Sequence, residues 1–239
     1  MFRRLVLIFA VSIGIALPAR AQDSRQGLDL SSLSDFELGQ RLDFITQRLE
    51  RDRRAGWMYQ WGWTAFYAAS MTQSIVDASL THDRKTKNTD IVEGAESFGS
   101  LVWSFASPHP ARLGAQPIFG MPDTNHEERV ERLRAAEDLL QEDADAANER
   151  YDTFPHLFNI ATNVAAGALI WSVADRTRAL RSAIPGLFIG EFEIFSAPIR
   201  ASGDLRDYNA RFNGVGRGQA QADWELVPTF GGAEIRFRF

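Results

Sequence analysis

The stretch that decides the fold is WMYQWGWTAFYAASMTQSIVDASL, residues 57–80. It carries no lysine or arginine and a single acid, Asp77, and it is long enough to cross a bilayer as a helix. It is also rich in glutamine, threonine and serine, which a helix facing lipid would avoid. A second uncharged stretch covers residues 157–174. The fold therefore depends on whether these segments span a membrane or pack inside a soluble helical bundle.

Composition gives arguments on both sides. Trp57, Tyr59, Trp61 and Trp63 gather at one end of the first segment, as in an interfacial aromatic belt. Against insertion, the mean hydropathy of the whole chain is -0.22. Basic residues flank both ends of this segment, so the positive-inside rule does not select an orientation. Insertion in a membrane and burial in a soluble bundle both stay open.

The N-terminus has the pattern of a secretory signal peptide. Two arginines precede the apolar run LVLIFAVSIGIAL, and Ala19 and Ala21 occupy the small-residue positions of a cleavage site. An uncleaved membrane anchor is the alternative. We expect residues 1–21 to be removed and residues 22–33 to be disordered. The predicted location is the cell envelope, either in the periplasm or at a membrane, the outer membrane included.

Charge and cysteine content exclude several classes of function. The formal net charge is -5, and removal of the signal peptide, which holds three arginines and no acid, makes the chain more acidic. An acidic chain is a poor partner for nucleic acid, so we expect none. The absence of cysteine excludes disulfides, thiolate metal sites and a cysteine nucleophile. Stability must therefore come from a packed core.

Capping signals and apolar spacing predict about five helices. Ser34 with Glu37, and Thr124 with Glu127, each form the pattern of a capping box. The helices are expected over 35–54, 57–80, 89–106 and 125–150, with a fifth from Pro155 onwards.

The C-terminal third carries weaker signals. In the run GLFIGEFEIFSAP, which begins at Gly186, residues 186–196 fit a strand or a helix, and both stay open. Residues 199–222 predict a loop or a weak strand. The runs DWELVPTF and AEIRFRF flank Gly231 and Gly232 and predict a β-hairpin. The predicted fold is mainly α: a multi-helix bundle over 34–198, then a loop and a small C-terminal β-hairpin over 199–239.

The last strand alternates apolar and charged residues and closes on Phe239. Over the segment GGAEIRFRF it resembles the C-terminal assembly signal of outer-membrane β-barrel proteins. The resemblance implies an outer-membrane location, but the chain lacks the regularly spaced strands of a barrel, so several copies would have to pool their strands. We favour a hairpin that packs its apolar face onto the helices and turns its charged face to water.

Polar residues within the uncharged segments form the candidate site. The candidates for ligand binding or for a buried polar network are His156, Asn159, Asn163, Gln60, Tyr67 and Asp77. The first three share one helix face, and the other three lie on one side of residues 57–80. Buried polar groups are costly unless they are paired. If the two stripes face each other, they form a polar network or a polar cleft.

No motif assigns a cofactor, a metal site or a catalytic residue. The histidines lack metal-ligand spacing, and no phosphate-binding or hydrolase fingerprint is present. Glu191 and Glu193 would share one face of a strand and would diverge on a helix.

The sequence predicts an exported bacterial cell-envelope protein, a membrane-associated structural or interaction protein whose biochemical function is unknown. A membrane is the expected partner, inserted or peripheral, and a protein partner is also compatible. The alternative is a periplasmic carrier of a small apolar or lipid ligand held between helices 57–80 and 157–174. An enzyme that uses His156 with an acid is the third and least favoured hypothesis.

Overall fold

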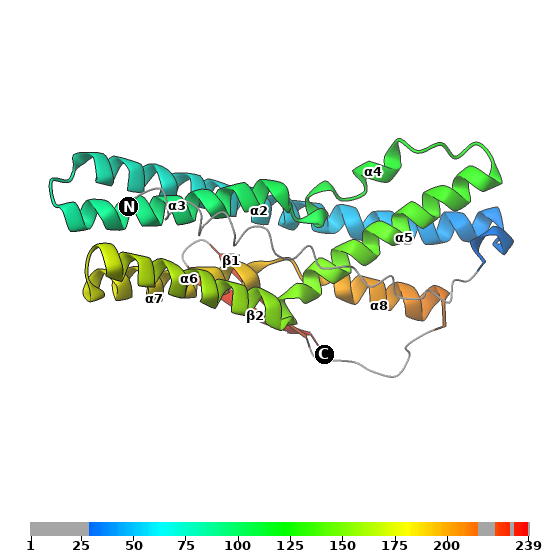
Figure 1. The fold of residues 1–239 in the computed structure, drawn as a ribbon. Helices are drawn as coiled ribbons and strands as arrows, with labels where there is room; N and C mark the ends of the chain where they lie inside the picture. The colour runs from blue at the N-terminus through cyan, green and yellow to red at the C-terminus, as the bar shows by residue number, and fades with distance from the viewer. Residues whose placement is uncertain (1–28, 215–222, 230–231, 239) are drawn as a thin grey trace. The chain divides into compact units, whose positions relative to one another are not determined.

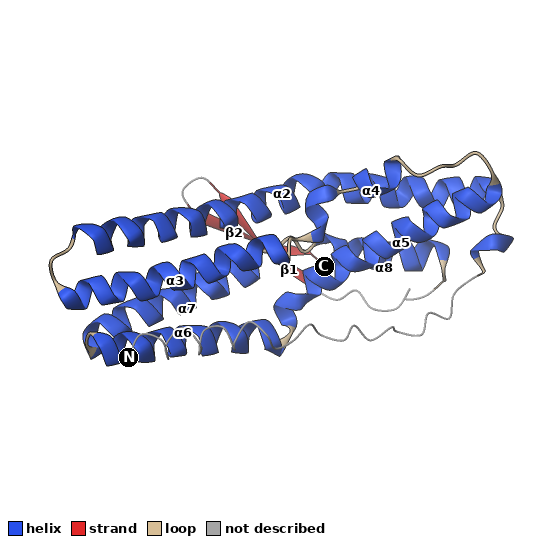
Figure 2. Ribbon diagram, turned by 45° about the horizontal axis from the view of Figure 1, so that its top comes forward, coloured by secondary structure: helices blue, strands red, loops and turns tan. Residues whose placement is uncertain are grey.

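The computed structural model describes residues 29–214, 223–229 and 232–238 (Figure 1). The chain divides into two compact units, Met1–Leu30 and Ser31–Phe239, and the description below concerns the second. The expected signal peptide lies outside the described residues, as does most of the segment expected to be disordered. The described part is mainly helical, which confirms the predicted class and the helical bundle (Figure 2).

The elements follow one another with short connections. In chain order they are η1 (Leu30–Ser32), α2 (Asp35–Leu80), α3 (Arg84–Ala106), η2 (Pro110–Leu113), α4 (Gln116–Phe119), α5 (His126–Asn148), η3 (Glu149–Tyr151), α6 (Thr153–Val173), α7 (Arg176–Ser196), α8 (Arg200–Phe212), β1 (Asp223–Thr229) and β2 (Gly232–Arg238).

Helix α2 is one continuous helix where the sequence predicted two. It begins at the capping box of Ser34 and Glu37, as expected, and ends at Leu80. The prediction of separate helices over 35–54 and 57–80 is wrong, because Gly56 does not interrupt the helix. A Cβ atom at Gly56 would lie 2.6 Å from the backbone of Ala111, so this glycine allows η2 to approach α2 closely.

Two other helix starts differ from the prediction. Helix α3 begins at Arg84, several residues early, because Asp83 caps it by accepting a hydrogen bond from the Thr86 amide at 3.1 Å. The second capping box is displaced by one residue. Asn125 accepts from the Glu128 amide at 2.9 Å, and Glu128 accepts from the Thr124 amide at 2.7 Å.

The segment after Pro185 is helical throughout. Residues 186–196 belong to α7, so the helix is the correct one of the two open alternatives. The loop expected over 199–222 is wrong for Arg200–Phe212, which forms α8. Helix α8 buries Ala201, Asp204 and Tyr208, whose spacing is helical, but its polar composition concealed that period in the sequence.

Helix contacts divide the described helices into two groups (Figure 1). Residues 35–56 of α2 pack with α5 and α8, and we call this group the body. Residues 57–80 of α2 pack with α3, α6 packs with α7, and α3 contacts α6. We call this second group the four-helix unit. Helix α2 is common to both groups.

Two strands follow the helices. β1 and β2 pair antiparallel, with Trp224 opposite Phe237 and Leu226 opposite Ile235 (Figure 2). Only the backbone of these strands is described. The role of the hairpin in closing the fold stays a prediction.

Candidate functional site

The body has the ordinary organisation of a water-soluble helical bundle. Its fully buried side chains include Leu38, Ile45, Leu49, Leu133 and Leu140. Within the described chain, α5 and α8 expose no large apolar side chain. Large apolar residues of the body therefore lie mainly inside it, with Phe36 of α2 as an exposed exception, and buried charged residues such as Arg41 and Asp204 have bonded partners.

The four-helix unit has the opposite organisation, because its large apolar side chains lie on the outside. Seven exposed ones lie on residues 57–80, five on α3, six on α6 and four on α7. On α7 they form one stripe along the helix: Leu180, Ile184, Phe188 and Phe192. Phe188 is 72% exposed and Trp171 of α6 is 62% exposed. Exposed apolar side chains in such number are typical of regions that contact a membrane or another protein.

The interior of the four-helix unit combines polar and small residues with one apolar cluster around Val92 and Ile170. Its buried polar residues are Gln60, Thr64, Thr89, Asn159 and Asn163. Small residues accompany them, including Gly94, Ala166, Gly167 and Ala179. Small and hydrogen-bonding residues between helices, with large apolar residues outside, are typical of helices that pack within lipid.

Two glycines of α7 receive the asparagines of α6. A Cβ atom at Gly190 would lie 2.0 Å from Asn159 Oδ1, and one at Gly186 would lie 2.0 Å from Asn163 Oδ1. Gly186 and Gly190 are four residues apart, a spacing that allows close helix packing. This glycine pair was not among the predicted site residues, although the segment GLFIG contains its spacing.

The asparagines form a buried hydrogen-bond network with α7. Asn159 Nδ2 donates to the Leu187 carbonyl at 3.0 Å and to Glu191 Oε1 at 2.9 Å. Asn163 Nδ2 donates to Asn159 Oδ1 at 2.8 Å. These bonds satisfy the polar groups that face α7.

His156 is held at both ring nitrogens. Nδ1 lies 2.7 Å from Glu191 Oε2, and Nε2 lies 2.9 Å from the Arg150 carbonyl. A carbonyl oxygen accepts only, so Nε2 carries a proton. A general base needs a free ring nitrogen near its substrate. In this arrangement His156 is suited to holding α6 against α7 rather than to proton transfer.

Gln60 and Tyr67 find partners on other elements. Gln60 Nε2 donates to the Ser104 carbonyl at 2.7 Å, and its Oε1 accepts from the His109 amide at 2.8 Å. Gln60 thus ties the end of α3 to the segment that follows it. The Tyr67 hydroxyl donates to Glu193 of α7. The hydrogen bonds of Gln60 lead to α3 and to His109, and that of Tyr67 leads to α7. The bonds of Asn159 lead from α6 to α7.

Glu191 and Glu193 diverge, as expected for a helix. Glu191 contacts α6 and Glu193 contacts α2. Helix α7 is therefore the element that contacts both stripes of candidate residues.

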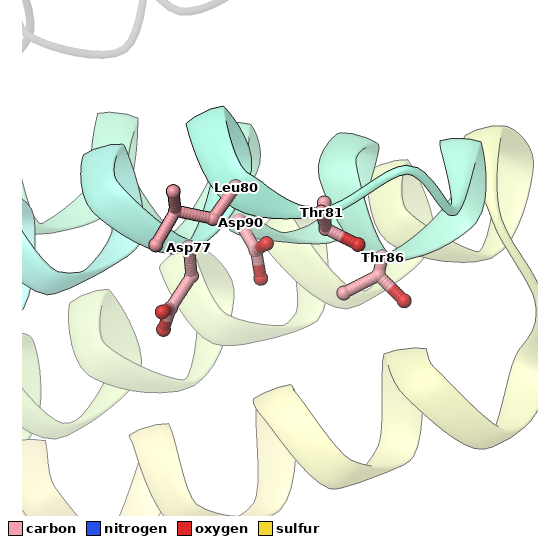
Figure 3. A pocket seen from close by; sticks show the side chains of 5 residues that line it. All are labelled: Asp77, Leu80, Thr81, Thr86 and Asp90. Atoms are coloured by element: carbon pink, nitrogen blue, oxygen red, sulfur yellow. The ribbon is translucent and has the colours of Figure 1, made fainter.

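Asp77 lies apart from the other candidate residues. With Leu80, Thr81, Thr86 and Asp90 it lines a cavity of about 360 Å³, open to solvent, where α2 turns into α3 (Figure 3). Within the described residues, no group of three or more histidine, aspartate or glutamate side chains could hold a metal ion.

Two titratable groups outside the four-helix unit are strongly perturbed by burial. Burial on α5, with Asp52 and Glu142 nearby, raises the pKa of Asp143 to about 7. Burial, with Arg112 nearby, lowers the pKa of His109 to about 4, so its ring is neutral at physiological pH. The His109 ring packs edge-on against Tyr59, with ring centroids 5.3 Å apart.

Among the described helices, α6 is long and apolar enough to cross a membrane by length and composition. Only 22% of its most apolar window is buried within the chain. The core helix of a soluble protein would be mostly buried.

Comparison of the chain with protein-family models, with curated proteins and with solved structures gives no match. Arguments about function rest on the geometry above.

Proposed function

We propose that this protein is an integral membrane protein of the bacterial cell envelope, with a structural or interaction role. The four-helix unit crosses the bilayer, and the body stands in the aqueous phase. The observation that supports this proposal is the inverted organisation of the four-helix unit beside the ordinary organisation of the body.

The lengths of the helices fit a bilayer. Helix α3 has 23 residues, and α6 and α7 have 21 each. At a rise of about 1.5 Å per residue, such helices span about 32–35 Å, against a hydrocarbon thickness of about 30 Å. Residues 57–80 of α2 are of similar length.

Aromatic side chains gather at the end of the unit nearest the body. Trp61 lies edge-on to Phe105, with ring centroids 6.3 Å apart. Trp103 and Phe158 have centroids 6.5 Å apart. Aromatic rings are enriched at the level of the lipid headgroups, so this ring of side chains supports a membrane boundary beside the body.

The polar content of residues 57–80 no longer opposes insertion. Gln60 and Thr64 are buried and bond to Ser104, whereas Trp57, Phe66 and Ile75 are exposed. Polar groups that bond between helices are compatible with an apolar environment. This distribution supports insertion of a segment whose mean hydropathy alone would not.

Fractionation tests the proposal. The full-length chain is expressed with its own N-terminus, and the membranes are washed with carbonate and then with urea. We expect the protein to stay in the membrane pellet and to be extracted by detergent. Release by carbonate as a monomer that stays soluble without detergent would overturn the proposal and favour a carrier of an apolar ligand. Release as a stable oligomer would assign the apolar surface to other copies of the chain.

We extend the proposal to export and to the hairpin. The pattern of residues 1–21 supports export. The contact of β1 with α7 supports a C-terminal hairpin that closes the fold against the helices. N-terminal sequencing of the mature protein tests the first, and a chain truncated after residue 214 tests the second.

A further inference from the structure

The two short connections of the four-helix unit lie at its end away from the body, opposite the group of aromatic side chains described above. Residues 81–83 connect α2 to α3, residues 174–175 connect α6 to α7, and the first turns of α3 (to residue 87) and of α7 (to residue 181) adjoin them. We call these connections and first turns the loop end. The Arg178 guanidinium joins them, because it bonds Asp83 at 2.9 Å and Asp175 at 2.5 Å.

The acids of the loop end are already occupied. Asp83 caps α3, and Asp175 caps α7 by accepting from the Arg178 amide at 3.0 Å. Arg178 pairs with both acids, and Lys85 lies 3.7 Å from Asp175. The Thr86 hydroxyl, which donates to Asp83 at 2.6 Å, and the Arg178 amide, which donates to Asp175, are the main causes that hold the pKa of the two acids below its usual range, so both stay charged.

Four basic side chains remain around these pairs. They are Arg84, Lys87, Arg176 and Arg181. All four are exposed, and none has an ion pair within the described chain. Asp77 and Asp90 line the open cavity, about one helical turn closer to the body than these basic residues. The rim of the loop end is therefore positively charged, immediately beyond the apolar surface formed by residues such as Leu80, Trp171 and Leu180.

Most basic residues at the other end of the unit pair with acids of the body, whereas Arg54 and Arg112 have no ion pair within the described chain. Arg48 bonds Asp204 at 2.9 Å, Arg51 pairs with Asp52 and Asp204, and Arg53 pairs with Glu50 at 3.1 Å. In the sequence, basic residues flank both ends of 57–80. In the structure, most of those flanking residues that have no ion pair lie at the loop end. Unpaired lysine and arginine in short loops favour the cytoplasmic side of a membrane.

We propose that the loop end lies in the cytoplasmic leaflet and that Arg84, Lys87, Arg176 and Arg181 bind anionic phospholipid headgroups there. This inference rests on the proposed insertion of the four-helix unit. Four spans place the body on the exported side, which agrees with the predicted signal peptide. Headgroup phosphates are complementary to basic side chains at this depth, because the apolar surface below them holds the loops at the headgroup layer.

Lipid preference tests the binding. The full chain is placed in nanodiscs of phosphatidylcholine, and phosphatidylglycerol is added as the probe. Each basic residue near the surface contributes about a five-fold preference for anionic lipid, so the two-charge variants Arg84→Gln/Lys87→Gln and Arg176→Gln/Arg181→Gln should each lose about 25-fold. The control Arg134→Gln/Arg206→Gln removes two exposed charges of the body and should keep the preference.

Labelling tests the orientation. The chain has no cysteine, so single cysteines report their own exposure. In intact spheroplasts, an impermeant maleimide should label Glu131→Cys on α5 and should label His82→Cys only after the membrane is opened.

The outcomes separate this inference from the proposed function. Loss of the protein from membranes by carbonate would overturn both. Two results would overturn the headgroup site alone. One is stable insertion without a preference for phosphatidylglycerol, and the other is an equal loss of that preference in the Arg134→Gln/Arg206→Gln control. Equal binding of inorganic phosphate to the detergent-solubilised protein would assign the charges to free anions. Labelling of His82→Cys from outside would reverse the orientation.

Discussion

Replacement of Gly190 by alanine tests the packing of α6 against α7. The new Cβ atom would lie 2.0 Å from Asn159 Oδ1 and 2.5 Å from its Cγ, so the asparagine must move. That movement breaks the bonds from Asn159 to the Leu187 carbonyl and to Glu191, and the bond that Asn163 donates to Asn159 Oδ1. The substitution therefore removes one of the contacts that join the two helices.

The expected cost follows from three terms. Bonds between membrane helices are worth about 0.6 kcal/mol each, which gives about 2 kcal/mol for the three. Overpacking adds about 1–3 kcal/mol. Alanine has a higher helix propensity than glycine, and this difference offsets about 1 kcal/mol of the loss. We expect Gly190→Ala to lower the free energy of unfolding by about 2–4 kcal/mol.

The assay is reversible unfolding of the detergent-solubilised chain, followed by circular dichroism. Gly99→Ala is the matched control, since a Cβ atom at that glycine of α3 meets nothing within 4 Å. It should be neutral or stabilising by up to about 1 kcal/mol. The double variant Asn159→Ala/Gly190→Ala should be more stable than Gly190→Ala, because the obstructing amide is gone. Equal stability of Gly190→Ala and Gly99→Ala would refute the packing described here.

Three further predictions concern the body and its junction with the unit. Gly56→Ala should destabilise the protein by about 2 kcal/mol, because its Cβ would lie 2.6 Å from the Ala111 backbone, whereas Gly39→Ala has open space and should not lower the melting temperature. The raised pKa of Asp143, about 7, means that the folded state binds a proton more tightly than the unfolded state, so this group's contribution is greatest below about pH 4 and declines as pH rises to about 7. Asp143→Asn should therefore be more stable than the parent at pH 8, by about 4 kcal/mol, with little gain at pH 4, and an equal gain at both would contradict the shift. Arg41→Ala removes the bonds to Asn213 and to the Phe212 carbonyl, both 2.9 Å, so hydrogen exchange in α8 should accelerate about 100-fold, whereas Arg134→Ala should leave it unchanged.

The sequence predicted the helical class because its signals are local. The capping box of Ser34 and Glu37 depends on residues three apart, and the apolar spacing of 125–150 is regular. Gly56 was misjudged because local propensity disfavours glycine in a helix, whereas its contact with Ala111 comes from residues far along the chain. Helix α8 was missed for a related reason, since its buried Asp204 is accounted for only by Arg48 and Arg51 of α2.

The candidate polar residues were recognisable by type, but their partners were not. Asn159 and Asn163 were placed on one helix face by their spacing. Their match to Gly190 and Gly186 needed the register of α6 against α7, which no local pattern encodes. The inverted organisation of the four-helix unit was equally hidden, because composition counts residues and does not say which side of a helix each one occupies.

Helix α2 has 46 residues, which makes it about 69 Å long at a rise of about 1.5 Å per residue. An unbroken ladder of backbone hydrogen bonds runs from the capped start beside α5 and α8 to the loop end, and Pro is absent from it. The body and the four-helix unit consequently lack a flexible joint along this element. A mechanical load applied to α5 or α8 must tilt residues 57–80 as well, so α2 acts as a stiff lever between the two groups.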